Sequence, residues 1–292
     1  MGFFKALFSG KEETPEERRQ ENKDKDFDVL KYDGVRAMKT GQLDYGIKCF
    51  KHALSIHDDL EIHDHLSLVY IQKGALEKAI EELQLLSEAQ PDNIHIWIRK
   101  ANVAYMLEDY QTMYEAAERA IDLDNEEPLS VFLRARASKG LGDNVGAIAM
   151  LTKAISLDHN YGDAYLLRGE MLLDMGDKEG AKADVAWLLE NIGDHEDVLL
   201  LDARIKQACG DIEGALSQYQ HVIDSNPFCV AAFRQRGALY REQGDMKKAA
   251  EDAAMVLELS PDDAAKVNGE FSSEGIEQKV RDAYKNANPL GL

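Results

Sequence analysis

The sequence of 292 residues predicts an all-α protein, an α-solenoid in which helix–turn–helix repeats stack one after another. The first observation behind this prediction is a Gly-Asp pair that recurs every 34 residues, at Gly142-Asp143, Gly176-Asp177, Gly210-Asp211 and Gly244-Asp245. The other two are small residues at fixed places in the repeat and an apolar stripe with helical spacing. A fixed period of about 20–50 residues is typical of repeat architectures.

The recurring Gly-Asp pair fits a tight turn between two helices. Glycine can adopt the left-handed conformation that ends one helix, and aspartate can then cap the next. Earlier in the chain the turn is weaker, at Gly41-Gln42, Gly74-Ala75 and Glu108-Asp109. With this turn as an anchor, we predict seven repeats, which begin near Phe27, Leu60, Ile94, Pro128, Gly162, Glu196 and Val230.

Two positions of the repeat carry small residues, which let two helices cross closely. The eighth position is small in every repeat: Gly34, Ser67, Ala101, Ala135, Gly169, Ala203 and Gly237. The twentieth position is mostly small: Gly46, Ala79, Met113, Ala147, Ala181, Ala215 and Ala249. The twenty-fourth and twenty-seventh positions, such as Phe50 and Ala53, are apolar and complete an i, i+4, i+7 stripe on the second helix.

These residues resemble the tetratricopeptide repeat (TPR) family over about residues 27–263. The resemblance implies a right-handed superhelix of about seven repeats with a C-terminal capping helix. The seventh position departs from the family pattern, because it is charged in most repeats. We predict that Arg168 and Arg236 at this position are structural and pair with acids on the second helix, such as Asp184 and Asp252. The third repeat is the most divergent, since it lacks the turn glycine and has Met113 at a small position.

Two terminal segments flank the repeats, residues 1–26 and residues 264–292. The first combines a short apolar segment with a charged linker over residues 11–26, which we expect to be either flexible or a polar helix. Its apolar residues share one helical face and form a candidate hook for a partner groove or, less favoured, a membrane surface: Phe3, Phe4, Leu7 and Phe8. Packing onto the first repeat and disorder are the alternatives for this face. Residues 264–292 are predicted to hold the capping helix, which starts after Ser272-Ser273, and a short tail.

Composition and motifs argue against several classes of function. The net charge of −20 disfavours nucleic-acid binding. The chain has no phosphate-binding glycine loop and no nucleophile elbow, and the repeat period accounts for its glycines. His63 and His65 are two residues apart and point to different sides of a helix, so they do not share a metal ion. We therefore expect no enzymatic activity, no cofactor and no metal site.

The remaining composition favours a cytoplasmic protein. No apolar stretch is long enough to span a bilayer, and the N-terminus lacks the pattern of a secretory signal. The three cysteines, Cys49, Cys209 and Cys229, are widely spaced. We expect them to be small buried residues in a reducing compartment.

The expected function is a non-enzymatic scaffold or adaptor that binds a peptide or helix of a partner protein in the concave groove implied by the resemblance. In the TPR family, peptide contacts come mostly from positions 2, 5, 6, 9, 12 and 13 of the repeat. These positions give the candidate groove residues Tyr32, His65, Arg99, Asn102, Tyr105, Phe132, Arg136, Lys139, Glu170, Arg204, Gln207, Arg234 and Arg241. Arginine recognises carboxylates and tyrosine supplies flat apolar contact, which favours an acidic partner.

Two other classes of function stay open. The chain could be a structural subunit that assembles through its ends or its convex face. Less favoured is a ligand sensor or an enzyme whose pocket is the interior of the superhelix, because the repeat leaves no catalytic set of residues unexplained.

Overall fold

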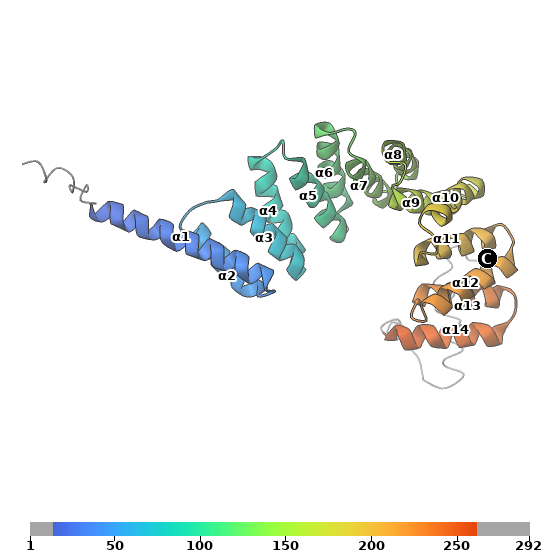
Figure 1. The fold of residues 1–292 in the computed structure, drawn as a ribbon. Coiled ribbons are helices and arrows are strands. Elements are labelled where there is room, and N and C mark those ends of the chain that lie inside the picture. Colours follow the sequence, from blue (N-terminus) through green and yellow to red (C-terminus); the bar gives the residue numbers. More distant parts are fainter. Residues whose placement is uncertain (1–13, 262–292) are drawn as a thin grey trace, which may run out of the picture. The chain divides into compact units, whose positions relative to one another are not determined.

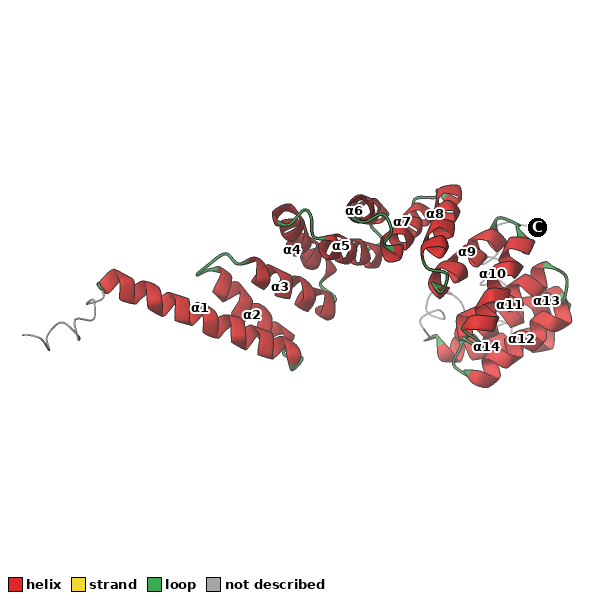
Figure 2. Ribbon diagram, turned by 45° about the horizontal axis from the view of Figure 1, so that its top comes forward, coloured by secondary structure: helices red, strands yellow, loops and turns green. Residues whose placement is uncertain are grey.

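The computed structural model describes residues 14–261, which form fourteen α-helices and no β-strand (Figures 1 and 2). The helices are α1 (Pro15–Lys39), α2 (Leu43–Leu54), α3 (Leu60–Lys73), α4 (Leu76–Ala89), α5 (Ile94–Met106), α6 (Tyr110–Leu123), α7 (Pro128–Gly140), α8 (Asn144–Leu157), α9 (Gly162–Asp174), α10 (Lys178–Asn191), α11 (Glu196–Ala208), α12 (Ile212–Ser225), α13 (Val230–Glu242) and α14 (Met246–Leu259). Six of the seven predicted repeats begin at the first residue of a helix.

The chain divides into two compact units, with the boundary inside α8 between Lys153 and Ala154. In the first unit α1 packs on α2, α3 on α4 and α5 on α6, and each second helix also packs on the next first helix. The second unit repeats this arrangement with α9 on α10, α11 on α12 and α13 on α14. Within each unit, the packing of these helices on their neighbours in sequence confirms the prediction of an all-α helical repeat.

The turn within each pair has the predicted geometry. Gly142, Gly176, Gly210 and Gly244 have φ between 79° and 85°, in the left-handed region. The following aspartate caps the second helix, as where Asp177 Oδ1 accepts a hydrogen bond of 2.9 Å from the Gly180 N–H. In the divergent third repeat Glu108 takes the same left-handed conformation, with φ of 57°. The turn is thus kept without its glycine.

The small positions lie where two helices touch. A Cβ added at Gly34 would come within 2.5 Å of the Phe50 ring, and one at Gly169 within 3.0 Å of Leu201. Met113 replaces a small residue at the twentieth position of the third repeat, yet it is completely buried and packs with Ala101 and Ala104. The pairing of α5 with α6 is therefore retained in the third repeat.

The first helix begins earlier than the repeat pattern predicts. Of the two alternatives for the charged segment, the structure shows the helix: α1 starts at Pro15 and runs without a break to Lys39. Thr14 caps it, because its side chain accepts from the Glu17 N–H while the Glu17 carboxylate accepts from the Thr14 N–H. The boundary predicted between residues 26 and 27 falls inside this helix.

Two predictions concern residues outside the described part of the chain. The candidate hook of Phe3, Phe4, Leu7 and Phe8 lies before residue 14, and the predicted capping helix lies after residue 261. A third prediction, on the cysteines, is partly wrong. Cys49 and Cys229 are buried, but Cys209 is exposed because it ends α11 at the turn toward α12.

Candidate functional site

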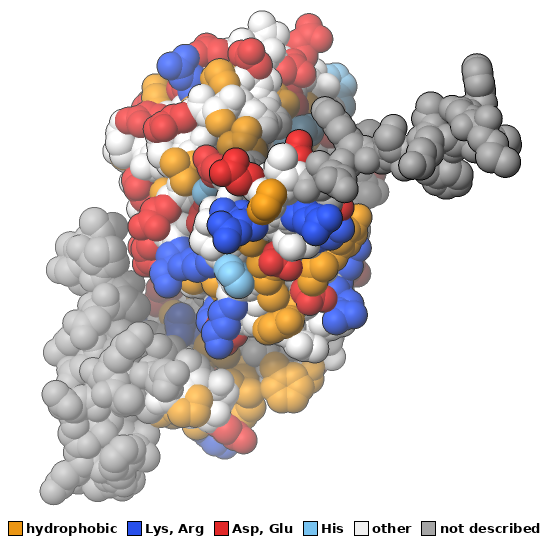
Figure 3. Space-filling view, turned by 90° about the vertical axis from the view of Figure 1, so that its left-hand side faces the viewer, with side chains coloured by type: hydrophobic (Ala, Val, Ile, Leu, Met, Phe, Trp, Pro, Cys, Tyr) orange, Lys and Arg blue, Asp and Glu red, His pale blue; other side chains and the backbone are white. Residues whose placement is uncertain are grey.

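The predicted groove residues all lie on the first helices of the pairs. We call the surface that these helices present the first-helix surface, which comprises α1, α3, α5 and α7 in the first unit and α9, α11 and α13 in the second. Helix α5 contacts α7 in the first unit, and α9 contacts α11 in the second, so side chains of neighbouring repeats meet there. On the face of the molecule drawn in Figure 3, basic, acidic and hydrophobic side chains are interspersed.

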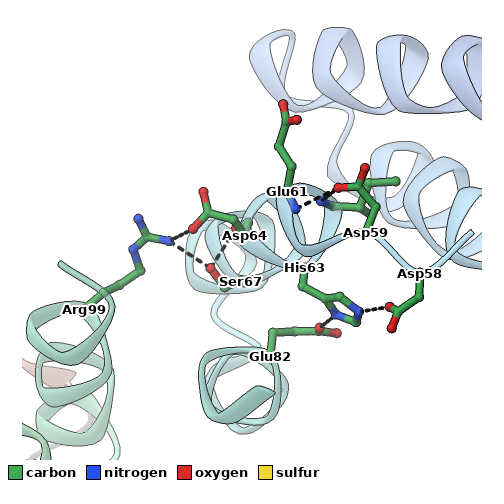
Figure 4. Close-up of polar contacts among 9 residues, drawn as sticks. Asp58, Asp59, Glu61, His63, Asp64, Ser67, Glu82 and Arg99 are labelled. Atoms are coloured by element: carbon green, nitrogen blue, oxygen red, sulfur yellow. Dashed lines mark hydrogen bonds and ion pairs between the residues drawn. The ribbon is translucent and has the colours of Figure 1, made fainter. Parts of the chain in front are cut away.

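Arg99 on α5 is held by the preceding repeat. Its Nη1 lies 2.5 Å from Asp64 Oδ1 and donates to Ser67 Oγ at 3.1 Å, both on α3 (Figure 4). The Arg99 side chain is 27% exposed and that of Asp64 37%. The charge that was predicted to face a partner is thus already compensated by a carboxylate of the same surface.

Arg136 on α7 has different neighbours. Its guanidinium lies 3.5 Å from the centroid of the Tyr105 ring on α5 and 5.5 Å from that of Phe132. Within residues 14–261, no carboxylate lies within ion-pairing distance of Arg136. Stacking on a ring orients the guanidinium plane while the N–H groups at its edge stay able to donate. The structure therefore brings Tyr105, Phe132 and Arg136 together as one cluster.

In the second unit, two of the predicted groove residues contact side chains of the neighbouring first helix. Arg204 Nη2 on α11 lies 2.8 Å from Asp174 Oδ1 at the end of α9. Gln207 donates to Glu242 Oε2 on α13 at 3.4 Å. Glu170 and Arg241 are half-buried, whereas Arg234 is exposed. This part of the first-helix surface carries acids and bases in contact.

Several predicted residues contribute little exposed area. Phe132 is only 7% exposed, so it supports Arg136 more than it meets a partner. Asn102 donates to the Ile98 carbonyl of its own helix at 3.0 Å. His65 stacks on Phe50, with ring centroids 5.4 Å apart, and its Nδ1 is buried without a hydrogen bond. Tyr32 on α1, by contrast, is 77% exposed, and Lys139 at the end of α7 is exposed.

The two arginines that were predicted to be structural are confirmed as such. Arg168 Nε and Nη2 donate to the two oxygens of Asp184 at 2.9 and 2.6 Å, and Arg236 binds Asp252 in the same way at 3.0 and 2.6 Å. The hydrogen bonds that Arg168 donates to Asp184 raise the pKa of Arg168. Burial opposes the charge of Arg236, but the bonds to Asp252 outweigh it and raise the pKa of Arg236.

The histidines near the start of α3 have separate environments, and Figure 4 shows that of His63. His63 Nδ1 lies 2.5 Å from Glu82 Oε2 on α4, and its Nε2 lies 3.0 Å from Asp58 Oδ1. His65 faces Phe50 instead. In the described part of the chain, no three histidine, cysteine, aspartate or glutamate side chains are grouped so that they could hold a metal ion.

The sequence did not reveal which of the predicted arginines are neutralised. Asp64 lies 35 residues before Arg99, and Asp174 lies 30 residues before Arg204. The first distance is close to one repeat, so an alignment of acids against the preceding repeat could have indicated that pair.

None of the helices in residues 14–261 combines the length and the hydropathy needed to cross a membrane.

Comparison with known proteins matches this geometry to one family. A tetratricopeptide repeat model matches residues 201–264, and another matches residues 60–93. A tetratricopeptide repeat protein of known structure from Parabacteroides merdae has a TM-score of 0.72 at 13% identity, over 89% of this chain and 99% of its own. PilF of Pseudomonas aeruginosa has a TM-score of 0.56 at 17% identity, over 72% of this chain and 96% of its own.

A third solved structure, YrrB, is described as a TPR protein with an unusual peptide-binding site. It has a TM-score of 0.50 at 18% identity, over 71% of this chain and 100% of its own. No curated protein sequence matches the chain. At these identities the solved structures show the fold alone.

The helix pairs, their glycine turns and the first-helix surface define an α-helical repeat scaffold. The chain is a tetratricopeptide repeat protein. Proteins of this family are in general non-enzymatic scaffolds that bind protein partners, and a general role as a protein-interaction scaffold follows for this chain.

Proposed function

We propose that the protein is an adaptor that binds a carboxylate-bearing segment of a partner protein on the first-helix surface of its first unit, at the cluster of Tyr105, Phe132 and Arg136. The observation that carries this proposal is the guanidinium of Arg136, stacked at 3.5 Å on Tyr105 and without an ion-pairing carboxylate in residues 14–261. Arg99 and Arg204 have such carboxylates, from Asp64 and Asp174.

An oriented arginine is a favourable receptor for a carboxylate. Its planar fork can donate two parallel hydrogen bonds, and an arginine that is already held by a ring loses less side-chain entropy on binding. The exposed edge of Tyr105, which is 37% exposed, adds flat apolar area beside the charge. The likeness in fold to YrrB is consistent with a peptide as the ligand.

A peptide array tests this proposal and does not require the partner to be identified. Each acidic peptide is paired with a version in which Glu is replaced by Gln and Asp by Asn. We expect binding to be concentrated among the acidic members, and Arg136→Glu to weaken it at least about tenfold, since it replaces attraction by repulsion.

The matched control is Lys51→Glu, the same change of charge at an exposed residue of α2, a second helix. It should leave peptide binding near normal. Equal binding of acidic and amide peptides, or equal loss in both variants, would remove Arg136 as the recognition residue.

A further inference from the structure

A cavity of about 500 Å³ opens where α4, α5 and α6 meet, in the first unit and on a different face of α5 from Tyr105. Trp97, Lys100, Tyr114 and Ala116 are among the residues that line it. Pockets for small molecules are commonly about 300–1,000 Å³ and combine apolar walls with a few polar groups. The cavity falls within the divergent third repeat.

Lys100 is the buried charged residue of this wall, whereas the other polar residues that line it are half-buried or exposed: Gln84, Glu115, Glu118, Arg119 and Asp122. The residue is only 9% exposed, and its Nζ donates to Gln84 Oε1 at 2.5 Å and lies 5.3 Å from the Trp97 ring centroid. An ammonium has three N–H donors, and Gln84 is neutral. No carboxylate within residues 14–261 lies close enough to form an ion pair with Lys100, although Glu115 and Glu88 attract it from farther away. A buried charge without a direct counter-ion is costly.

Other repeats show what Lys100 lacks. It stands at the seventh position, where Arg168 and Arg236 each bind an aspartate sixteen residues later in the chain. Sixteen residues after Lys100 stands Ala116, which also lines the cavity. Arg134, at the seventh position of the fourth repeat, pairs instead with Glu118, sixteen residues earlier in the preceding helix pair. The residue sixteen positions before Lys100 is the neutral Gln84.

We propose that this cavity binds a small monocarboxylic acid, whose carboxylate pairs with Lys100 in the place that an aspartate takes in the fifth and seventh repeats. The apolar body of the ligand lies against Trp97 and Tyr114. A single negative charge is favoured, because Glu115, Glu118 and Asp122 also line the cavity and would repel a second one. The site is separate from the proposed partner site at Arg136.

Binding of a carboxylate in the cavity is coupled to the protonation of Lys100. Burial lowers the pKa of Lys100, and Glu115 and Glu88 only partly oppose this effect. A bound carboxylate stabilises the ammonium form. Ligand binding and protonation of Lys100 therefore favour each other.

Fluorescence of Trp97 reports on the site directly. The chain has two tryptophans, Trp97 and Trp187, so Trp187→Phe leaves only the one in the cavity wall. In this background, titration with phenylacetate should give a saturable change in emission. Phenylacetamide has the same shape without the charge and should bind at least about tenfold more weakly, a loss of about 1.4 kcal/mol. Equal binding of the two compounds overturns the proposal.

Two substitutions test the role of the charge on Lys100 and of the carboxylate that it lacks. Lys100→Met keeps the aliphatic stem and removes the charge, so phenylacetate binding should fall at least about tenfold. Ala116→Asp supplies the missing carboxylate from within the chain. It should raise the midpoint of thermal unfolding and abolish phenylacetate binding, because the new carboxylate would take the place that Asp184 takes beside Arg168.

Ala116→Asn is the matched control for Ala116→Asp, since it has the same size without the charge. The proposal requires the aspartate variant to be more stable than the asparagine variant. It is overturned if the two variants are equally stable, or if phenylacetate binds undiminished to Lys100→Met or to Ala116→Asp.

Discussion

The seventh residue of the repeat shows how one cation takes different roles according to the residues around it. Arg168 and Arg236 each hold a buried aspartate of their own pair through two hydrogen bonds. Arg236 also donates from Nη1 to Gln220 Oε1 at 2.5 Å on the preceding pair, and so joins α12, α13 and α14. Lys100 has no such acid. The seventh position of the repeat thus forms a buried ion pair in the fifth and seventh repeats and borders a cavity in the third.

Replacement of Arg236 by alanine should destabilise the second unit. The substitution leaves Asp252 with only 3% exposure and no counter-ion, and loss of one partner of a buried pair typically costs about 3–5 kcal/mol. Chemical denaturation of the full chain measures this loss. Arg234→Ala, two residues earlier at an exposed position of α13, is the control and should cost less than about 1 kcal/mol. A loss of equal size in both variants would mean that the pair with Asp252 adds no stability.

The geometry around His63 makes the stability of the first unit depend on pH. Carboxylate oxygens lie at both ring nitrogens, at 2.5 Å from Glu82 and 3.0 Å from Asp58. A neutral imidazole has one N–H and one lone pair, so only the imidazolium can donate to both. Burial disfavours the charge, but the hydrogen bonds to Glu82 and Asp58 outweigh it, and the pKa of His63 is raised.

The sign of the pH effect follows from this raised pKa. The pair with Glu82 and Asp58 adds full stability below the unfolded-state pKa of about 6.5, and the gain is lost as pH rises through the higher folded-state pKa. We expect the difference in unfolding free energy between the native chain and His63→Gln to be largest near about pH 6 and to shrink toward about pH 9. A difference that is constant over this range would contradict the imidazolium assignment.

At the scale of the helix pair, the turn of the third repeat carries a local strain. Glu108 adopts φ of 57°, where the equivalent turns use glycine, and a left-handed conformation costs an ordinary residue about 1–2 kcal/mol. Replacing Glu108 by glycine would remove this cost, but glycine also raises the conformational entropy of the unfolded chain, which offsets part of the stability gained. Glu108→Gly should therefore raise stability by about 0.5–1 kcal/mol, measured by denaturant unfolding.

The reverse substitution, Gly210→Glu, is the matched control for this turn. Gly210 has φ of 85°, and no atom lies within 4 Å of an added Cβ, so backbone conformation alone sets the cost. It should lower stability by about 1 kcal/mol. Opposite or absent changes in the two variants would show that φ at this turn is not what limits stability.

The helices were predictable wherever local sequence and tertiary packing agree. The turns and the small positions of the repeat predicted the starts of six first helices. These positions are informative because an added Cβ at Gly34 or Gly169 would collide with the neighbouring helix. The start of α1 was missed, since its first turns are exposed and have no apolar period to reveal them. Thr14, Pro15 and Glu17 were the available signal, a capping box with proline at the first helical position.

At the scale of the whole chain, the repeat placed every predicted groove residue on a first helix, but it did not determine which charges remain available. Availability depends on side chains of the neighbouring repeat, such as Asp64 beside Arg99 and Tyr105 beside Arg136. The cavity at Lys100 depends likewise on a missing group at Ala116. Such features are set by differences between repeats, whereas the repeat pattern reports what they have in common.

The net charge of −20 leads to a prediction about the stability of the whole chain. Self-repulsion among excess acids destabilises a compact state, and salt screens it over distances beyond about 10 Å at 0.1 M. Buried pairs such as Arg236 with Asp252 are screened much less, so the net effect of salt is stabilising. The midpoint of thermal unfolding at neutral pH should rise by a few degrees between about 0.02 M and 0.3 M sodium chloride.

The control for this salt effect is the same titration near about pH 5, close to the pI of about 4.8, where the net charge is small. With little self-repulsion left to screen, the rise in the unfolding midpoint should nearly vanish there. Exposed ion pairs such as Lys73 with Asp44 lose strength in salt and act in the opposite direction. An unfolding midpoint that falls with salt at neutral pH would therefore mean that surface pairs outweigh the repulsion of the excess acids.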